Sequence, residues 1–198
     1  MARNTQPVLK RCRTLGVSPA VMGYSRTSNK NPGGQRRAKK SEYATQLTEK
    51  QKVKFVYGIQ EKQFHAYYEK ASKMAGNTGE ELLCMIERRL DNVVYRLGFA
   101  STRREARQLV NHGHFTVNGK RVNFPSYLVK TGDVVAVCEK SCSNAFFKKL
   151  KEDDVFASTP KWLDRDKNTL TGKVIAAPAR EDIDFEIAEH LIVELYSK

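Results

Sequence analysis

The chain has 198 residues, of which 40% are hydrophobic and 9% aromatic, a composition that excludes a wholly disordered protein. Its formal net charge is +13, and residues 1–54 hold thirteen lysines and arginines against two acidic residues. This local excess indicates a polyanionic partner. Nucleic acid is favoured over an anionic membrane, because no amphipathic helix with a strong apolar face accompanies the basic residues.

The chain lacks two features of exported or membrane-bound proteins. No apolar run approaches the roughly 20 residues that span a bilayer. The first residues, MARNTQPVLKRCR, do not contain the apolar stretch of a secretory signal. We therefore expect a soluble, cytoplasmic protein.

The first forty residues are basic and irregular in pattern. We expect a short helix in VLKRCRTL that ends at Gly16, and then a loop rich in Gly, Asn, Ser, Arg and Lys that orders only against a partner. Tyr43 follows this loop and is a candidate stacking ring. The basic residues that this region offers to a nucleic acid are Lys10, Arg11, Arg13, Arg36, Arg37, Lys39 and Lys40.

Helical patterns follow. Thr48 is a candidate N-cap for a helix that ends at the next glycine, and residues 59–75 form a second helix whose aromatic residues have the spacing of core positions. Thr78 and Glu81 form a predicted capping box ahead of a strongly apolar helix. Residues 1–90 are thus predicted to form a helical domain with a basic N-terminal extension.

A different pattern begins near Asp91, where a short amphipathic helix is followed by a second one. Ser101 or Thr102 is the expected cap of that second helix, and Glu105 can complete a capping box. At 100° per residue, one arc of this helix faces a core and the opposite arc carries positive charge. The predicted core arc is Ala106, Leu109 and Val110, and the predicted charged arc is Arg103, Arg104 and Arg107.

A β-hairpin is predicted directly after this helix. Gly113 ends the helix, and Asn118-Gly119 is a strong signal for a two-residue turn because both positions need positive φ. A further strand follows in GDVVAV. Since the chain reverses at Gly113, the hairpin returns its cations to the arginine helix and a phosphate-binding face results. Its predicted members are Arg103, Arg104, Arg107, His112, His114, Asn118, Lys120 and Arg121.

The fold class expected from these patterns is α+β. The helix–hairpin module is predicted to occupy residues 91–150. Residues 151–198 form an acidic, mixed segment that packs back on the other domains, with Trp162 anchoring local packing. Within that segment GKVIAAP and HLIVELY are expected to be strands. The C-terminal strand is expected to return to the first domain.

The four cysteines are scattered, which favours free thiols. Two alternatives remain for Cys138 and Cys142: a disulfide, or half of a metal site completed by His112 and His114. Their spacing matches no familiar zinc pattern.

The stretch RRLDNVVYRLGFASTRREARQLVNHGHFTVNGKRV, together with PSYLVKTGDVVAV, resembles the S4 RNA-binding domain. The segments KQKVKFVYGIQEKQF and HLIVELYSK also resemble bacterial ribosomal protein S4, in the same order along the chain. By this resemblance the chain is identified as a member of the bacterial-type small-subunit ribosomal protein S4 family. The resemblance runs over most of the chain from about residue 35.

The resemblance implies a function in the ribosome. Family members bind small-subunit (16S) ribosomal RNA first, hold a junction of helices in its 5′ domain and nucleate assembly of the subunit body. It also implies a contact with ribosomal protein S5 that affects translational accuracy, contacts with other small-subunit proteins, and a position near the channel through which messenger RNA enters. No cofactor, membrane or small-molecule substrate is expected.

One departure from the family concerns zinc. Many members carry an N-terminal cluster of four cysteines that binds zinc, and here only Cys12 remains of that pattern. A structural zinc site normally needs four nitrogen or sulfur ligands. We therefore predict the zinc-free form, with no metal ligands.

Two other functions compete with the ribosomal one. A pseudouridine synthase borrows the same RNA-binding domain, but that enzyme needs a separate catalytic domain with an aspartate nucleophile, and no acidic residue after residue 150 has such a setting. His112 and His114 also lack a nucleophile or paired carboxylate nearby. The chain is thus predicted not to be an enzyme. A stress-related RNA-binding protein of the same superfamily would leave the long N-terminal extension unexplained.

Overall fold

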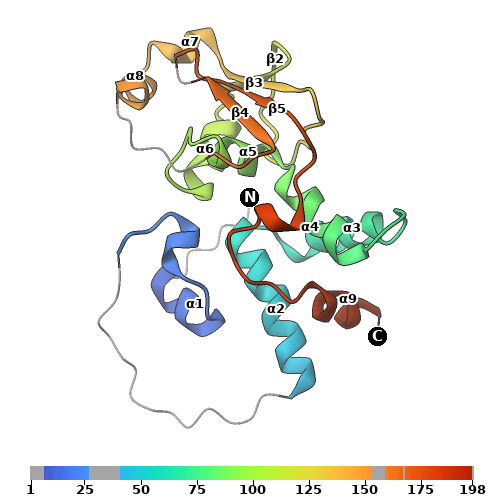
Figure 1. Cartoon of the computed structure of the whole chain (residues 1–198). Coiled ribbons are helices and arrows are strands. Elements are labelled where there is room, and N and C mark those ends of the chain that lie inside the picture. The colour runs from blue at the N-terminus through green and yellow to red at the C-terminus, as the bar shows by residue number, and fades with distance from the viewer. Residues whose placement is uncertain (1–6, 27–40, 153–158, 167, 198) are drawn as a thin grey trace. The chain divides into compact units, whose positions relative to one another are not determined.

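The computed structural model forms two compact units (Figure 1). The first comprises Met1–Leu82 and Ile183–Lys198, so it is built from both ends of the chain, and the second comprises Leu83–Asp182. The residues that the structure describes are 7–26, 41–152, 159–166 and 168–197. The mixture of helices and a small antiparallel sheet confirms the predicted α+β class.

The first unit is helical. Its elements are α1 (Val8–Leu15), the 3-10 helix η1 (Pro19–Met22), α2 (Glu42–Tyr57), α3 (Glu61–Ala71), the first half of α4 (Thr78–Glu87) and α9 (Glu189–Ser197). The predicted end of the first helix is confirmed, because Gly16 has a φ of +70°, the left-handed conformation that favours glycine after a helix. Phe64 and Tyr67 of α3 are buried, as their helical spacing predicted.

Two predicted helix caps are wrong. Helix α2 begins earlier than expected, with the Ser41 hydroxyl accepting a hydrogen bond from an amide of the first turn at 3.3 Å, so that Thr48 lies inside the helix. At the start of α4 the Asn77 side-chain oxygen accepts from the Gly79 amide at 3.0 Å, so Asn77 rather than Thr78 is the cap. In each case a side-chain acceptor further upstream satisfies the first free amides.

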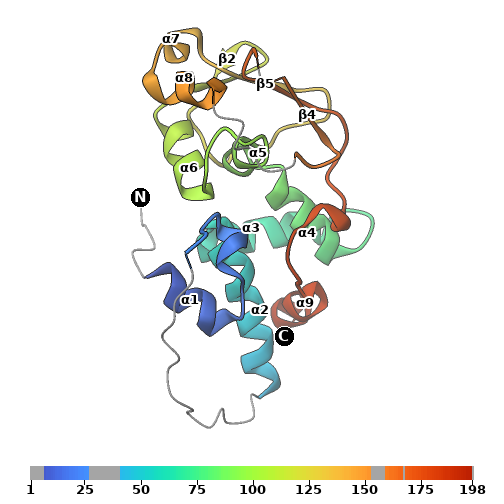
Figure 2. The same ribbon diagram turned by 60° about the vertical axis from the view of Figure 1, so that its left-hand side comes forward.

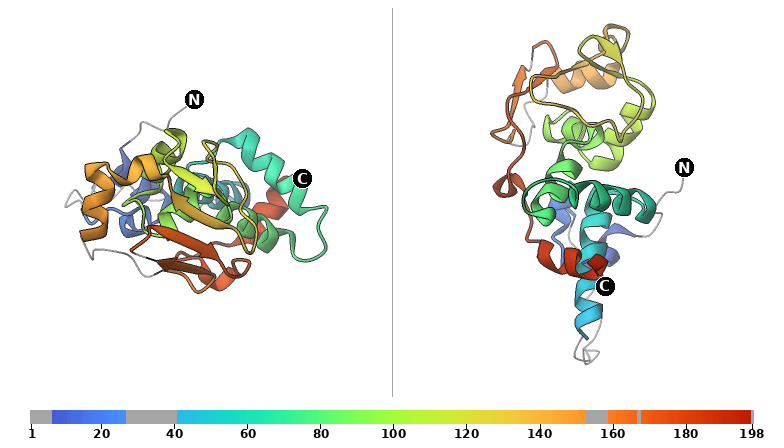
Figure 3. Two further views of the ribbon diagram at one scale, coloured as in Figure 1. Left: turned by 90° about the horizontal axis from the view of Figure 1, so that it is seen from above. Right: turned by 90° about the vertical axis from the view of Figure 1, so that its right-hand side faces the viewer.

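The C-terminal segment is a helix, so the predicted strand in HLIVELY is wrong. A short apolar run is ambiguous between strand and helix until packing decides. In α9 the four-residue spacing puts Ile192 and Tyr196 on one face. Ile192 is fully buried, and the Tyr196 ring stacks on Tyr68 of α3 at a centroid distance of 4.7 Å. Helix α9 packs beside α2, as Figures 1 and 3 show.

The second unit combines helices with a five-stranded sheet (Figures 1 and 2). After the second half of α4, its elements are α5 (Leu90–Arg96), α6 (Arg103–Asn111), β1 (Phe115–Val117), β2 (Lys120–Arg121), β3 (Val134–Val137), α7 (Glu139–Cys142), α8 (Ala145–Glu152), β4 (Leu163–Asp166), β5 (Thr171–Val174) and the 3-10 helix η2 (Arg180–Asp182).

The sheet has the order β2-β1-β3-β5-β4, and every neighbouring pair is antiparallel. The predicted hairpin is confirmed: Val117 pairs with Lys120, and the turn residues Asn118 and Gly119 have φ values of +50° and +76°. The β4–β5 hairpin, orange to red in Figure 3, lies alongside the yellow β3. Residues from the acidic segment thus complete the sheet that begins with the hairpin.

The core of the second unit lies between α5, α6 and the sheet. Ala106 and Val110 of α6 are fully buried in it and Leu109 is partly buried, which confirms the predicted core arc. Trp162 is 2% exposed and belongs to the same cluster. At Gly172 of β5, a Cβ atom would collide with the Leu97 side chain, so this close approach of helix and strand requires glycine.

Candidate nucleic-acid interface

The candidate interface is built on the start of α6, which is capped as predicted. The Thr102 hydroxyl accepts a hydrogen bond from the Glu105 amide at 3.2 Å. The Glu105 carboxylate in turn accepts from both the amide and the hydroxyl of Ser101, each at 2.7 Å. These bonds satisfy donors that the first turn of a helix would leave unpaired. They hold the basic residues of α6 on a defined backbone.

Arg103 does not lie on an exposed face, and its predicted placement there is wrong. It is 6% exposed, and its Nε donates to Asn92 Oδ1 at 2.8 Å. Its guanidinium carbon lies 4.4 Å from the centroid of the Tyr95 ring, the geometry of a cation–π contact. The 100° spacing within α6 predicted that Arg103 faces solvent, because that prediction took no account of α5. In the structure α5 supplies the partners that a buried arginine needs.

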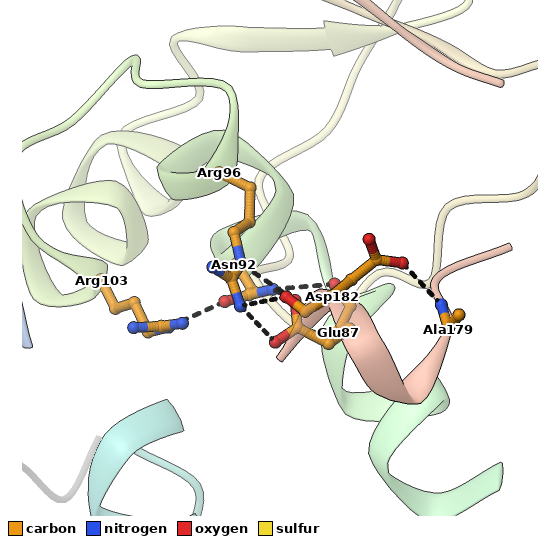
Figure 4. Close-up of polar contacts among 6 residues, drawn as sticks. All are labelled: Glu87, Asn92, Arg96, Arg103, Ala179 and Asp182. Atoms are coloured by element: carbon orange, nitrogen blue, oxygen red, sulfur yellow. Dashed lines mark hydrogen bonds and ion pairs between the residues drawn. The ribbon is translucent and has the colours of Figure 1, made fainter. Parts of the chain in front are cut away.

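The partners of Arg103 belong to a buried polar network, drawn in Figure 4. Glu87 is fully buried, and Arg96 donates to both of its carboxylate oxygens, at 2.9 and 3.1 Å. Asn92 donates to the Glu87 side chain at 2.6 Å, and Arg96 also reaches the Asp182 carbonyl at 3.3 Å. Two charges can be buried here because each has a paired, hydrogen-bonded partner.

A second buried pair lies at the start of α5. Arg89 donates to the Asp91 carboxylate through two nitrogens, at 3.0 and 2.7 Å, and both residues are buried. Arg107 of α6 approaches the same carboxylate at 3.8 Å while its side chain stays 24% exposed. Sequence reasoning missed both networks. The sequence did contain one indication of them. The stretch RRLDN, residues 88–92, places charged and polar residues at the start of a helix that is otherwise mostly apolar.

Arg121 joins the hairpin to the helix. From β2 its Nε donates to the Gly113 carbonyl at 2.7 Å and its Nη2 to the His112 carbonyl at 3.0 Å. These carbonyls lie at the C-terminal end of α6, where the helix dipole favours a cation. Gly113 has a φ of +70°, and a Cβ there would lie 2.5 Å from Arg121 Nε, so glycine is required.

Arg104 and Lys120 are exposed, on α6 and β2 respectively. The five predicted cations are therefore divided between two settings. Arg103 is buried in the domain, whereas Arg104, Lys120, Arg121 and in part Arg107 present charge to solvent, and Arg121 also caps the helix. Asn118 also has a place in the fold, because its side chain donates to Asp133 at 2.8 Å and accepts from the Val134 amide at 2.9 Å.

The two histidines lie together near this junction. Their ring centroids are 5.9 Å apart, His112 is exposed, and His114 Nδ1 lies 2.9 Å from the Ser141 hydroxyl. Burial lowers the pKa of His114 below its ordinary value, and the neighbouring His112 and Arg121 lower it further. The shift favours the neutral form of His114, while the exposed ring of His112 lies at the surface.

The predicted basic residues of the N-terminal region belong to the first unit. Lys10 and Arg13 of α1 are exposed, and Arg11 donates to the side chain of Gln51 in α2 at 3.3 Å. The predicted contacts Arg36, Arg37, Lys39 and Lys40 lie outside the described residues.

All four cysteines are free thiols in the structure. Cys12 is a buried residue of α1, and the Cys84 thiol donates to the Pro178 carbonyl at 3.0 Å. Burial raises the pKa of Cys138, whose thiol contacts the Gly113 carbonyl at 3.5 Å. Within the described residues no three His, Cys, Asp or Glu side chains are grouped as metal ligands.

No helix among the described residues combines the length and apolar character needed to cross a membrane.

Comparisons with known proteins cover nearly the whole chain. Residues 3–87 match the family described as ribosomal protein S4/S9 N-terminal domain, and residues 88–135 match the S4 domain. Three relatives are named small ribosomal subunit protein uS4. That of Fusobacterium nucleatum is 52% identical, that of Caldicellulosiruptor bescii 62% and that of Caldicellulosiruptor saccharolyticus 63%, each over the full length of both chains. The chain therefore belongs to the uS4 family of small ribosomal subunit proteins.

Proposed function

We propose that this chain is a structural component of the small (30S) ribosomal subunit and binds 16S ribosomal RNA directly. The observation that carries the proposal is full-length membership of the uS4 family, in which the S4 domain spans residues 88–135. Its place of action is accordingly the ribosome, in the cytoplasm. The net charge of +13 supports a polyanionic partner.

The geometry of α6 and β2 supports binding of phosphate. Arg104 and Lys120 project charge from elements that are already fixed, α6 by its caps and β2 by the contacts of Arg121. Because the backbone is ordered before binding, less conformational entropy is lost when the side chains meet phosphate. Proteins contact double-stranded RNA largely through its phosphates and 2′-hydroxyls. A short basic helix is better suited to such contacts than to reading bases in the major groove of a nucleic acid.

Finer roles are proposed on the family resemblance alone. They are early binding that nucleates assembly of the subunit body, a contact with ribosomal protein S5 that influences translational accuracy, and a position near messenger RNA. We propose no catalytic role, since the uS4 family is a family of ribosomal structural proteins. A turnover assay on unmodified RNA tests the enzymatic alternative, and cosedimentation with small subunits tests the alternative of a free stress-related protein.

The direct test is RNA affinity at several salt concentrations. The variant Arg104→Gln/Lys120→Gln should bind small-subunit ribosomal RNA more weakly, and the slope of log K against log salt should fall by roughly 0.7–0.9 for each phosphate that the variant no longer neutralises. Lys173→Gln is the matched control, because Lys173 is an exposed cation on β5 of the same unit. Glu105→Gln is a poor control, since it would weaken the cap of α6. Equal affinities and slopes in all three proteins would refute a phosphate contact at Arg104 and Lys120.

A further inference from the structure

Two exposed aromatic residues lie in the connection between β2 and β3. Phe124 is 68% exposed and Tyr127 is 39% exposed. Phe124 has the largest exposed fraction among the large apolar side chains exposed in the described residues. Single exposed apolar residues are common on proteins and need no explanation. Two exposed aromatic rings on one turn, shortly after the exposed Arg121, do require one.

The turn is held by hydrogen bonds to the start of α5. The Tyr127 amide donates to the Phe124 carbonyl at 3.0 Å, which closes the turn. The Asp91 amide donates to the Pro125 carbonyl at 3.2 Å, and the Leu90 amide to the Tyr127 carbonyl at 2.8 Å. These carbonyls satisfy amides that the first turn of α5 would leave unpaired. Pro125 is buried, so the backbone is anchored while the two rings remain exposed.

The same anchor connects the turn to the cations of α6. Asp91, whose amide holds Pro125, has a carboxylate that lies 3.8 Å from Arg107 Nη1. On the other side, Phe124 follows Arg121 of β2 by three residues, and Arg121 is bonded to the C-terminal end of α6. The aromatic turn is therefore fixed to the start of α5, and the exposed cation Arg121 precedes Phe124 by three residues.

We propose that Phe124, supported by Tyr127, stacks on an unpaired base of the bound RNA. The proposal rests on the RNA-binding function above and adds a contact that basic residues cannot supply. Unpaired bases expose apolar faces that stack on aromatic side chains, and any base can stack in this way. The adjacent positive charge favours nucleic acid over an apolar protein surface as the occupant. Because the backbone is already fixed, little ordering cost accompanies the contact.

The test compares Phe124→Ala, Phe124→Leu and Phe124→Trp in binding to small-subunit ribosomal RNA. Removing a stacking ring should weaken binding by roughly 5- to 140-fold, whereas tryptophan should retain it. Leucine keeps apolar area without an aromatic face, so it should bind nearly as weakly as alanine. The salt slope should be the same in all three variants as in the unchanged protein, since every phosphate-binding cation is retained.

Two controls keep this test separate from that of the proposed function. Ile175→Ala removes another exposed apolar side chain of the same unit and should bind as the unchanged protein does. A fully paired RNA duplex should bind Phe124→Ala and the unchanged protein equally, because it offers no unpaired base. If the unchanged protein does not bind ribosomal RNA, the proposed function fails. If the unchanged protein binds and Phe124→Ala binds equally well, stacking is refuted. If Phe124→Ala binds RNA normally but is incorporated poorly into small subunits, Phe124 contacts a protein instead.

Discussion

Neighbouring arginines in α6 serve different purposes. Arg103 is 6% exposed and bonded to Asn92, whereas Arg104 is exposed. Successive residues of a helix are rotated by about 100°, so one of the two can face α5 while the other faces solvent. The charge of a residue therefore does not identify it as a contact for nucleic acid. Its partners within the fold decide between the two roles.

Substituting these two arginines separates the roles. Arg103→Gln should lower the free energy of unfolding by about 1.5–3 kcal/mol, because a hydrogen bond from a charged group is removed inside the domain. Arg104→Gln should change it by less than about 0.5 kcal/mol, as is usual for exposed positions. Chemical denaturation measures both. Equal free energies of unfolding for the two variants would contradict the structural role of Arg103. Arg104→Gln should bind RNA more weakly than the unchanged protein when the same fraction of each is folded.

Glu61 is the residue whose protonation links pH to stability in the first unit. Partial burial raises its pKa, but hydrogen bonds from Lys54, Lys50 and Tyr196 outweigh that effect and lower the pKa from 4.5 to about 2. A lowered carboxyl pKa stabilises the folded state above the unfolded value of 4.5, and that contribution is lost as pH falls toward about 2. The carboxylate joins α2, α3 and α9.

Glu61→Gln should therefore reduce the acid sensitivity of the protein. Between about pH 4.5 and 2 the melting temperature of the unchanged protein should fall more steeply than that of the variant. Thermal unfolding followed at half-unit pH steps measures this difference. Glu69→Gln provides the comparison, because Glu69 is a well-exposed carboxylate on the same helix. Parallel curves for Glu61→Gln and the unchanged protein would show that the Glu61 contacts contribute nothing.

At the scale of elements, close approach between helices and strands depends on a few glycines and caps. Arg121 closes the C-terminal end of α6 from β2, and it can do so only because Gly113 lacks a side chain. Gly172 lets β5 approach Leu97, at the end of α5. Helix α9 likewise exists because Ile192 and Tyr196 find a surface on the helices of the first unit.

Gly172→Ala should disturb the packing of β5 against α5. The added methyl group collides with Leu97, which is fully buried, and overpacking of this kind costs about 1–3 kcal/mol. Lys173→Ala, at the adjacent exposed position, should cost much less. Urea unfolding of the two variants makes the comparison, and a Gly172→Ala variant as stable as Lys173→Ala would argue against a tight contact.

At the scale of the whole molecule, the two units divide the chain at Leu82–Leu83 and at Asp182–Ile183. The acidic segment is shared between them, since β4 and β5 belong to the second unit and α9 to the first. Both units contribute exposed basic residues, such as Lys10 and Arg104. The proposed domain boundaries at residues 90 and 150 remain predictions, which limited proteolysis can test.

The absence of zinc is a prediction about the whole chain. Cys12 is the one residue that remains of the family's cysteine cluster, and it is a buried residue of α1. We expect purified protein to contain no stoichiometric zinc and its melting temperature to be unchanged by a chelator, because a structural zinc site would contribute directly to folding. Elemental analysis measures the first quantity and thermal unfolding with and without chelator the second. About one zinc per chain would overturn the prediction.

Local chemistry made several features predictable from the sequence. The hairpin follows from Asn118-Gly119, which adopt positive φ more readily than other residues. The start of α6 follows from Thr102 and Glu105, and its core arc from the spacing of Ala106 and Val110. These features depend on residues within a few positions of one another. The amino-acid sequence by itself determined the helix, the turn and the positive charge of the candidate interface.

Tertiary structure decided the setting of each charge. Arg103 is buried because α5 supplies Asn92 and Tyr95, and the exposed Arg121 caps α6 because the hairpin returns to it. HLIVELY becomes a helix because an apolar stripe meets the helices of the first unit. None of these outcomes follows from the pattern of a single element, since each requires partners on another helix or strand. Packing against other elements decides whether a short apolar run becomes a helix or a strand. It also decides whether an arginine is buried, because a buried charge needs partners that replace water.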